Sequence, residues 1–212
     1  MDLIHTRKHL ELAVDQLVAL EPRFKVVVET HGLPPLRKLP EGAPTIFRIV
    51  TDQLISRTAA QAIWNRIAAG LAPLTAERVA ASNETELRRL GLTGAKARAF
   101  LAISEADILG HFDRRHLQSL DDNDVRAHLM QIRGIGPWTA EIYMLSVLGR
   151  ADAWPAGDIA LQTATAHLLE LSVRPDAREM ERLSVLWRPL RSVAARLLWC
   201  HCRGMGRIDQ GK

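Results

Sequence analysis

The sequence predicts an all-α protein, and three observations support this fold class. Apolar residues recur at three- and four-residue spacing along most of the chain, for example at Leu10, Val14 and Leu17. No segment shows the alternating apolar and polar pattern of a half-buried strand. Prolines, glycines and capping residues divide the helical pattern into segments of ordinary length, so we expect a series of short helices.

Helical spacing is found in eleven segments. They are, in chain order, residues 10–18, 24–28, 45–56, 58–69, 83–90, 95–109, 121–132, 137–148, 159–171, 176–186 and 189–202. Several ends carry their own signals: Asn83 with Glu86 resembles a capping box, and Gly91 and Gly110 mark helix ends. Four prolines between residues 32 and 44 indicate an ordered loop or a crossing between lobes.

Composition permits a folded domain and excludes several classes of protein. Hydrophobic residues make up 47% of the 212 residues, which is enough for a buried core. The 28 basic and 24 acidic residues give a net charge of +4, too mild to identify a nucleic-acid protein. No apolar run approaches a membrane span, and the start lacks the layout of a signal peptide. We expect an intracellular, cytoplasmic protein without membrane contact, nucleoid-associated if bacterial.

The chain has two cysteines, Cys200 and Cys202. Their separation suits neither a stabilising disulfide loop nor a four-ligand metal site. We therefore expect free thiols on a C-terminal helix, followed by a polar, frayed tail over residues 203–212.

The most informative segment is LMQIRGIGPWTAE, residues 129–141. One predicted helix runs into Gly134 and Gly136, and a second begins with Pro137 at its first position. Glycine permits positive φ and the close approach of another backbone, while Ile135 is expected to plug the junction between the helices. The second helix would present free N–H groups and its positive dipole end, which suits a phosphate, and Thr139 would add a hydroxyl.

Other interpretations of this segment are available. An ordinary αα-hairpin, whose glycines serve only the turn, is the simplest. The wider pattern, apolar-x-Gly-Ile-Gly-Pro-x-Thr-Ala, matches the helix-hairpin-helix motif closely and favours DNA binding. A dinucleotide-binding loop fits poorly, because Thr139 stands where its third glycine belongs and a helix precedes the turn. Such a hairpin holds the DNA backbone, so it positions the protein without selecting a sequence.

Residues 90–96 show a weaker similarity to a hairpin. A helix end, a short loop and a helix start explain this segment more simply. Lys96 and Arg98 are nevertheless candidates for contact with a phosphate.

A carboxylate follows the hairpin at Asp158, within the string WPAGDIALQ. Asp158 stands where a helix should begin, so in isolation it would be a plain N-cap. A helix-hairpin-helix, a Gly/Pro-rich loop and then an aspartate form a more specific combination. The chain in this respect resembles the HhH-GPD superfamily of DNA glycosylases, which is named after these three features.

The resemblance covers roughly residues 47–199 and is closest to bacterial 3-methyladenine DNA glycosylase II. It implies a two-lobed helical fold with the active-site cleft between the lobes. The whole chain would be one such domain, in a compact form without an N-terminal β-rich domain. Residues 1–45 and 159–205 would form one lobe and residues 46–150 the other, with the helix-hairpin-helix at about 122–148.

The resemblance implies that Asp158 is the catalytic carboxylate. Departure of a purine leaves positive charge on the sugar, which an ionised carboxylate stabilises while it can also orient the attacking water. The target base must first leave the stack. By resemblance Gln53, Leu54 and Ser56 would face the minor groove, with Leu54 as the wedge that fills the vacated space. A core leucine on an amphipathic helix is the alternative for Leu54.

The resemblance also places four residues around the extracted base. Trp138 and Trp199 match pocket tryptophans, whose indole faces attract a cationic base. Ile142 stands where the resembled enzyme has a pocket tyrosine, with Tyr143 next to it, so the base preference stays open.

Departures from other members of the superfamily concern cofactors and strand cleavage. Trp138 replaces the lysine that forms a Schiff base in members that also cut the strand, so no lyase step is expected. Two cysteines cannot supply the four ligands of the iron–sulfur cluster found in some relatives. No cofactor is expected for catalysis. By analogy, the carbonyls of Met130, Ile132 and Gly134 would hold a structural Na⁺ or K⁺ in the hairpin.

The expected function is that of a monofunctional glycosylase for alkylated purines of the 3-methyladenine and 7-methylguanine type, leaving an abasic site. Its partner would be double-stranded DNA with damaged bases, bound by a monomer. Two alternatives remain: a non-catalytic protein that binds DNA lesions through the hairpin, and a glycosylase for deaminated or oxidised bases.

Overall fold

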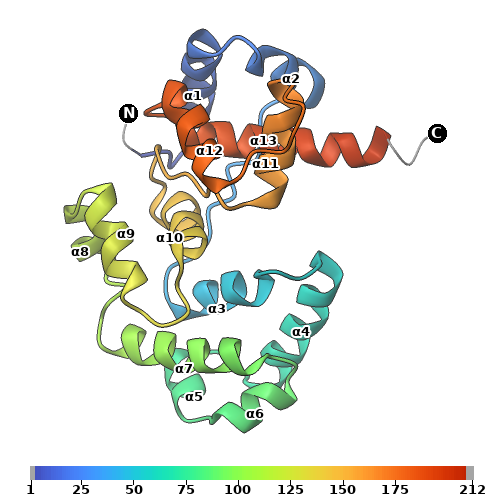
Figure 1. Cartoon of the computed structure of the whole chain (residues 1–212). Helices are drawn as coiled ribbons and strands as arrows, with labels where there is room; N and C mark the ends of the chain where they lie inside the picture. The colour runs from blue at the N-terminus through green and yellow to red at the C-terminus, as the bar shows by residue number, and fades with distance from the viewer. Residues whose placement is uncertain (1–2, 209–212) are drawn as a thin grey trace. The chain divides into compact units, whose positions relative to one another are not determined.

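The computed structural model describes residues 3–208, which form thirteen α-helices, one π-helical segment and one 3-10 turn (Figure 1). Within that range no strand forms, and the only β pairing is an isolated bridge between Leu3 and Arg150. The all-α fold class is therefore confirmed. None of the described helices is long and apolar enough to cross a membrane. The chain divides into two compact units, each with its own core.

Unit 1 comprises Met1–Lys38 and Met144–Lys212. Its elements are α1 (Arg7–Leu20), α2 (Phe24–His31), the π-helical η1 (Met144–Leu148), α11 (Ile159–Leu168), α12 (Ala177–Leu183), the 3-10 turn η2 (Ser184–Trp187) and α13 (Arg191–Ile208). Thr6 and Asp176 cap α1 and α12 with side-chain oxygens that accept backbone N–H bonds. The unit thus brings segments from both ends of the sequence together.

Helix α13 is the centre of unit 1. It packs against α1, α2 and α11, and residues 191–198 are all buried. Beside it, the ring of Trp187 lies edge-to-face with Phe24 and with Trp154, at centroid distances of 5.3 and 5.4 Å. Because Trp154 belongs to the loop that leads to Asp158, this aromatic cluster anchors that loop in the core.

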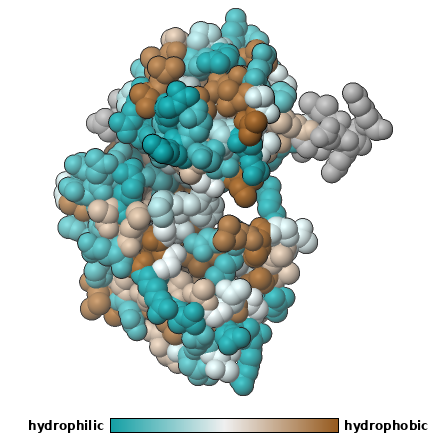
Figure 2. Space-filling view, in the orientation of Figure 1, coloured by the Kyte–Doolittle hydropathy of each residue, from teal (hydrophilic) through white to brown (hydrophobic). Residues whose placement is uncertain are grey.

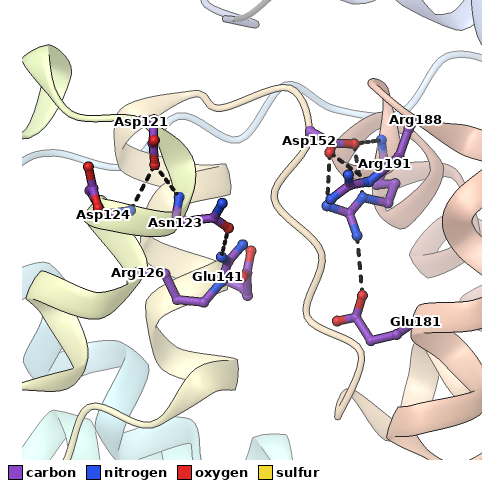
Figure 3. A network of polar contacts seen from close by, with 9 residues as sticks. All are labelled: Asp121, Asn123, Asp124, Arg126, Glu141, Asp152, Glu181, Arg188 and Arg191. Atoms are coloured by element: carbon purple, nitrogen blue, oxygen red, sulfur yellow. Dashed lines mark hydrogen bonds and ion pairs between the residues drawn. The ribbon is translucent and has the colours of Figure 1, made fainter.

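An ion-pair network fastens the start of α13 to the same loop (Figure 3). Arg191 is 5% exposed and makes a bidentate ion pair with Asp152. Its Nε donates to Oδ1 at 2.9 Å, and its Nη2 donates to Oδ2 at 2.8 Å. Glu181 accepts from Arg191 Nη1 at 3.2 Å, and Arg188 Nε lies 3.3 Å from Asp152 Oδ2. The bidentate geometry offsets the desolvation of a buried guanidinium.

Unit 2 is the continuous segment Leu39–Tyr143. Its helices are α3 (Ala43–Asp52), α4 (Arg57–Gly70), α5 (Ala76–Ala80), α6 (Glu84–Arg89), α7 (Gly94–Ile108), α8 (Arg114–Ser119), α9 (Asp122–Met130) and α10 (Pro137–Tyr143). Helix α7 packs against α3, α5 and α6. Phe47 from α3 and Phe100 from α7 stack at 4.5 Å between ring centroids and form the middle of this core.

The helix-end signals in unit 2 are confirmed. Asn83 and Glu86 form both bonds of a capping box at the start of α6. Gly91 and Gly110 follow helix ends with φ of 105° and 82°, in the region that favours glycine. Thr93 caps α7, so residues 90–96 are a helix end, a loop and a helix start.

Several helix ends differ from the prediction. The helix expected over residues 45–56 ends at Asp52, because Gln53 leaves the helical region with ψ of 129°. The helix expected over residues 137–148 changes from α- to π-helical turns after Tyr143. The division between units falls at the same place, so η1 and the loop after it belong with unit 1 and not with the hairpin lobe proposed from the sequence.

The C-terminal helix is longer than predicted. The frayed tail was expected from residue 203, yet α13 continues to Ile208. A Cβ on Gly204 would lie 2.3 Å from His31 Cε1, so packing against α2 supports the extra turns. Residues 209–212 of the expected tail lie outside the described range. Cys200 and Cys202 are free thiols on this helix, as predicted.

The face shown in Figure 2 is largely hydrophilic, with hydrophobic residues in separate groups. Scattered exposed apolar side chains are normal on a folded protein. Among the large hydrophobic side chains of the described range, Leu54 is the most exposed at 98%, followed by Leu109 and Val173 at 75%. An almost fully exposed leucine is unusual, and Leu54 is the residue proposed from the sequence as the wedge.

Candidate functional site

The hairpin connects α9 and α10 and has the predicted form. Ile135 is 5% exposed and plugs the junction, while its N–H donates to the Ile132 carbonyl at 3.0 Å. Pro137 is the first residue of α10, where a backbone N–H is not needed. An ion pair between Arg126 on α9 and Glu141 on α10 holds the two helices together (Figure 3).

The two hairpin glycines differ in backbone conformation and in what surrounds them. Gly134 has φ of +94°, and a Cβ there would lie 2.2 Å from Ala99 Cβ on α7, so conformation and packing both require glycine. Gly136 has no left-handed φ, and a Cβ there would meet no atom within 4 Å. Its N–H makes no backbone hydrogen bond within residues 3–208. Nothing in the described chain requires glycine at position 136, whereas a ligand lying against the backbone would.

Thr139, which is predicted to add a hydroxyl to a phosphate site, is buried and has a protein partner. Thr139 is 1% exposed, and its Oγ1 accepts a hydrogen bond from Gln53 Nε2 at 2.7 Å. The same Nε2 lies 3.3 Å from the Gly134 carbonyl oxygen. The Gln53 amide is therefore turned toward the hairpin. It fastens the segment after α3 to the hairpin.

Leu54 projects from unit 2. Its side chain is 98% exposed and its φ is +55°. Because α3 has already ended, the alternative of a core leucine on an amphipathic helix is wrong. A left-handed conformation costs a non-glycine residue roughly 1–2 kcal/mol. Leu54 buries almost nothing that could offset this, so contacts of neighbouring residues must hold the turn. Two residues later, Ser56 caps α4, with Oγ accepting from Ala59 N–H at 3.2 Å.

Lys96 and Arg98, the two candidates for phosphate contact outside the hairpin, both have protein partners. Lys96 Nζ donates to the carbonyls of Thr51 and Gln53, each at 2.8 Å. Burial lowers the pKa of Lys96. Arg98 Nη1 pairs with Glu84 at 2.9 Å. Lys96 therefore binds the C-terminal end of α3, where a cation is favourable.

Asp158 lies at the N-terminus of α11 on a well-held loop. Its Oδ1 accepts from Leu161 N–H at 3.0 Å, which makes it the predicted N-cap. Its backbone N–H donates to Pro155 O and its carbonyl accepts from Gln162 N–H, each at 2.9 Å. Gln162, 8% exposed, also donates from Nε2 to Ala156 O at 3.1 Å. The loop thus presents the carboxylate in one fixed orientation.

Trp199 supplies another donor to this carboxylate. Its Nε1 lies 3.3 Å from Asp158 Oδ1, and α13, which carries it, packs against α11. Cys202 is one turn further along α13. Burial, and secondarily the charge of Asp158, raises the pKa of the Cys202 thiol, which therefore stays protonated beside the carboxylate. The sequence suggested Trp199 as a pocket wall and gave no sign of its bond to Asp158.

Gly157 resembles Gly136 in its backbone conformation and in its open surroundings. A Cβ at Gly157 would meet no atom within 4 Å, and its φ is not left-handed. Among the glycines from Gly32 to Gly204, these two alone have neither a left-handed φ nor a close neighbour. One precedes the first turn of α10 and the other immediately precedes Asp158. Both positions leave the backbone open to a close ligand.

Comparison with known proteins explains why these features occur together. A family profile described as "HhH-GPD superfamily base excision DNA repair protein" matches residues 47–189. The matched region includes Leu54, the hairpin and Asp158. The chain belongs to the HhH-GPD superfamily.

Two relatives of this HhH-GPD protein are similar over most of their length. In Schizosaccharomyces pombe, alkylbase DNA glycosidase-like protein mag2 is 26% identical, covering 88% of this chain and 91% of its own. DNA-3-methyladenine glycosylase 1 of that yeast is 29% identical, with 86% and 83% covered.

Solved structures give the same result. The yeast 3-methyladenine DNA glycosylase in complex with abasic DNA has a TM-score of 0.80 at 27% identity, covering 88% of this chain and 94% of its own. The DNA-3-methyladenine glycosidase of Bacillus halodurans has a TM-score of 0.77 at 27% identity, with 92% and 91% covered.

The remaining pocket candidates of the HhH-GPD protein separate into two groups. Trp138 and Ile142 are half-buried and lie four residues apart on α10, so they share one face of the helix. Tyr143 is 2% exposed, and its ring lies 5.9 Å from that of Phe112. Tyr143 is therefore a core residue of unit 2 and does not offer its ring to a base.

Sequence reasoning missed two features of this HhH-GPD site. The sequence predicts only a phosphate contact for Lys96, and it gives no sign of the pairing of Arg191 with Asp152. In both cases the partner is about forty residues away in the chain, at separations of 43 and 39 residues. A charged residue at a helix start carries no local sign of such a partner.

Proposed function

We propose that this chain is a monofunctional DNA glycosylase that removes alkylated purines of the 3-methyladenine and 7-methylguanine type. It acts as a monomer on double-stranded DNA that contains damaged bases, and it leaves an abasic site. Similarity to 3-methyladenine DNA glycosylases over more than four fifths of the chain supports this substrate class.

The observation that carries the proposal is the fixed carboxylate of Asp158. N–H groups of Leu161 and Trp199 donate to its Oδ1 and hold the carboxylate in place. As the N-glycosidic bond breaks, positive charge develops on the sugar. A preorganised anion stabilises this charge without having to reorganise, and it can orient the attacking water.

The reaction needs no general acid when the base is alkylated at N3 or N7. Such a base is already cationic and leaves with the bonding electrons as a neutral molecule. Indole faces attract a cationic ring, so Trp138 and Trp199 are each candidates for contact with the base. Because position 138 is not lysine, no amine is present there to form a Schiff base with the sugar. The product is therefore an abasic site with an intact strand.

The hairpin and the Leu54 turn serve DNA binding in this proposal. The open backbone at Gly136, next to the first turn of α10, suits a phosphate. Exposed Leu54 would enter the stack where the damaged nucleotide leaves it. The hairpin recognises backbone, so the protein would bind duplexes of any sequence and select the lesion by its pocket.

Two of the three candidate carbonyls for a monovalent cation already accept a hydrogen bond. Gly134 O accepts from Gln53 Nε2 at 3.3 Å, and Ile132 O accepts from Ile135 N–H at 3.0 Å. A donor that faces a carbonyl oxygen competes with a cation for its lone pairs. Met130 is the remaining candidate. No step of the proposed reaction depends on a cation.

Substitution of Asp158 by Asn tests the proposal. Asparagine caps a helix nearly as well as aspartate but carries no charge. Base release from methylated duplex DNA should fall at least about a hundredfold, with DNA affinity retained. Asp176→Asn is the matched control, because Asp176 also caps a helix, with Oδ1 accepting from Glu179 N–H at 2.8 Å. It should release bases at the wild-type rate.

The other outcomes separate the alternatives. Binding to lesion-containing DNA without base release by the wild type would indicate a lesion-binding protein. Release of deaminated or oxidised bases but not of alkylpurines would change the substrate class. Strand cleavage in the absence of added base or heat would contradict a monofunctional enzyme.

A further inference from the structure

The exposed turn at Leu54 needs support from residues other than Leu54. The residue adopts φ of +55° with 98% of its side chain exposed, so packing does not select this conformation. Helix α3 ends two residues earlier, at Asp52, and α4 begins at Arg57. A short connection without its own buried side chains would otherwise sample several conformations.

Lys96 binds the backbone on the N-terminal side of this turn. Its Nζ lies 2.8 Å from Thr51 O, in the last turn of α3, and 2.8 Å from Gln53 O. The Gln53 carbonyl belongs to the planar peptide unit that joins Gln53 to Leu54. Fixing that oxygen therefore fixes the plane from which the Leu54 backbone starts.

Gln53 is held from a second direction by the hairpin. Its side-chain amide donates to Thr139 Oγ1 at 2.7 Å and lies 3.3 Å from Gly134 O. The main chain of Gln53 is thus bound by α7 through Lys96, and its side chain by the hairpin. Leu54 therefore follows a residue whose carbonyl and side chain are both held by hydrogen bonds.

Lys96 lies in a part of α7 that is held in place by a helix cap and by packing. The first turn of α7 is capped by Thr93, whose Oγ1 accepts from Lys96 N–H at 3.3 Å, and α7 packs along α3. Burial lowers the pKa of Lys96, and the charge of Asp52 opposes this effect. A half-buried ammonium needs acceptors, and the two carbonyls supply them.

We propose that Lys96 is a positioning residue that holds the Leu54 turn in its projecting conformation before DNA binds. This inference rests on the proposed function, in which Leu54 enters the base stack. Lys96 would act through Leu54 and not by neutralising a phosphate.

Substitution of Lys96 by Met keeps the length of the side chain and removes both hydrogen bonds. With a lesion-containing duplex, base release should fall about tenfold or more, equivalent to about 1.4 kcal/mol in activation free energy. Affinity for an undamaged duplex and its dependence on salt should stay at wild-type values. Loss of one phosphate contact would instead lower the slope of log K against log salt by about 0.9 and would overturn the proposal.

The matched control is Lys25→Met. Lys25 is an exposed helical lysine of unit 1, with its Nζ 3.8 Å from Glu29 Oε1, whereas the hairpin and the Leu54 turn belong to unit 2. It should release bases at the wild-type rate. Wild-type protein without any release would refute the proposed function itself. Active wild type with an equally active Lys96→Met variant would refute only the role of Lys96.

A double-mutant cycle tests whether Lys96 acts through Leu54. In a Leu54→Ala background, Lys96→Met should cause little additional loss of base release, because the side chain that it positions is gone. Additive losses would contradict the proposal. Fluorescence of 2-aminopurine opposite or beside the lesion reports base flipping, which should decrease in Lys96→Met and not in Lys25→Met.

A melting curve decides whether each variant is folded. If Lys96→Met does not fold, Lys96→Arg and Lys96→Gln give the same comparison. Arginine offers donors for both carbonyls and should recover flipping, whereas glutamine offers a weaker, uncharged donor and should recover less. Equal flipping by folded arginine and glutamine variants at the wild-type level would overturn the proposal.

Discussion

At the scale of single residues, one hydroxyl buried in unit 2 has an unusual environment. Tyr143 is 2% exposed, and its Oη has no hydrogen-bond partner in the described part of the chain. Burial raises the pKa of Tyr143, and the charges of Glu41 and Asp107 raise it further. Ionising this group inside the core is therefore much harder than ionising it in water.

Stability should consequently depend on Tyr143 at alkaline pH. Its pKa is raised in the folded state, so its contribution is complete below the unfolded value of about 10. That contribution is lost as pH rises above about 10, because the unfolded chain then ionises first. The Tyr143→Phe variant should lose less stability between about pH 10 and pH 11 than the wild type, in denaturant titrations at each pH.

The chain contains one tyrosine, so absorbance of phenolate reports this residue alone. The folded protein should show little phenolate at pH 11, and unfolding should release the full signal at that pH. A phenolate signal that appears near pH 10 while the helical circular dichroism is unchanged would contradict the assigned burial.

At the scale of elements, the hairpin combines a packing requirement with an open surface. Gly134 presses against Ala99 of α7, whereas Gly136 faces no atom of the described chain. The sequence motif contains both glycines and does not distinguish them. The difference appears only when α7 is brought against the hairpin.

Alanine substitutions should separate these two roles. Gly134→Ala adds a methyl group at 2.2 Å from Ala99 Cβ and strains a left-handed backbone, so the free energy of unfolding should fall by about 2 kcal/mol or more. Gly136→Ala should leave the melting temperature nearly unchanged and weaken DNA binding. Melting curves and fluorescence anisotropy with a labelled duplex measure both. Equal melting temperatures for the two variants would contradict this division.

At the scale of the whole molecule, each unit supplies a different requirement of the proposed reaction. Unit 2 carries the hairpin and the Leu54 turn, and unit 1 carries Asp158 and Trp199. The net charge of +4 is too small to attract DNA strongly by itself. Binding should depend on a limited number of local phosphate contacts.

Affinity for undamaged DNA should therefore be sensitive to salt and insensitive to sequence. Each phosphate contact contributes about −0.9 to the slope of log K against log salt. Undamaged duplexes of equal length and different sequence should bind within about threefold of one another, because the hairpin contacts backbone. Anisotropy titrations at several salt concentrations measure both quantities. A strong preference for one undamaged sequence would show that base edges are read.

Features that depend on local backbone chemistry can be predicted from the order of residues alone. Helical spacing established the all-α class, and the capping box at Asn83 and Glu86 marked a true helix start. The glycines and Pro137 of the hairpin, with Asp158 as a helix cap, indicated the superfamily. Each of these constraints acts within a few residues, so each is visible in the order of side chains.

Contacts between side chains that are far apart in the chain became visible with the folded structure. It exposed Leu54, turned Gln53 and Thr139 toward each other, moved Tyr143 into the core and brought Trp199 to Asp158. It also gave Lys96 two backbone partners in place of a phosphate. These outcomes depend on how helices pack, and the partners are separated by about forty residues or more. Local spacing carries no information about such pairs, because packing brings them together.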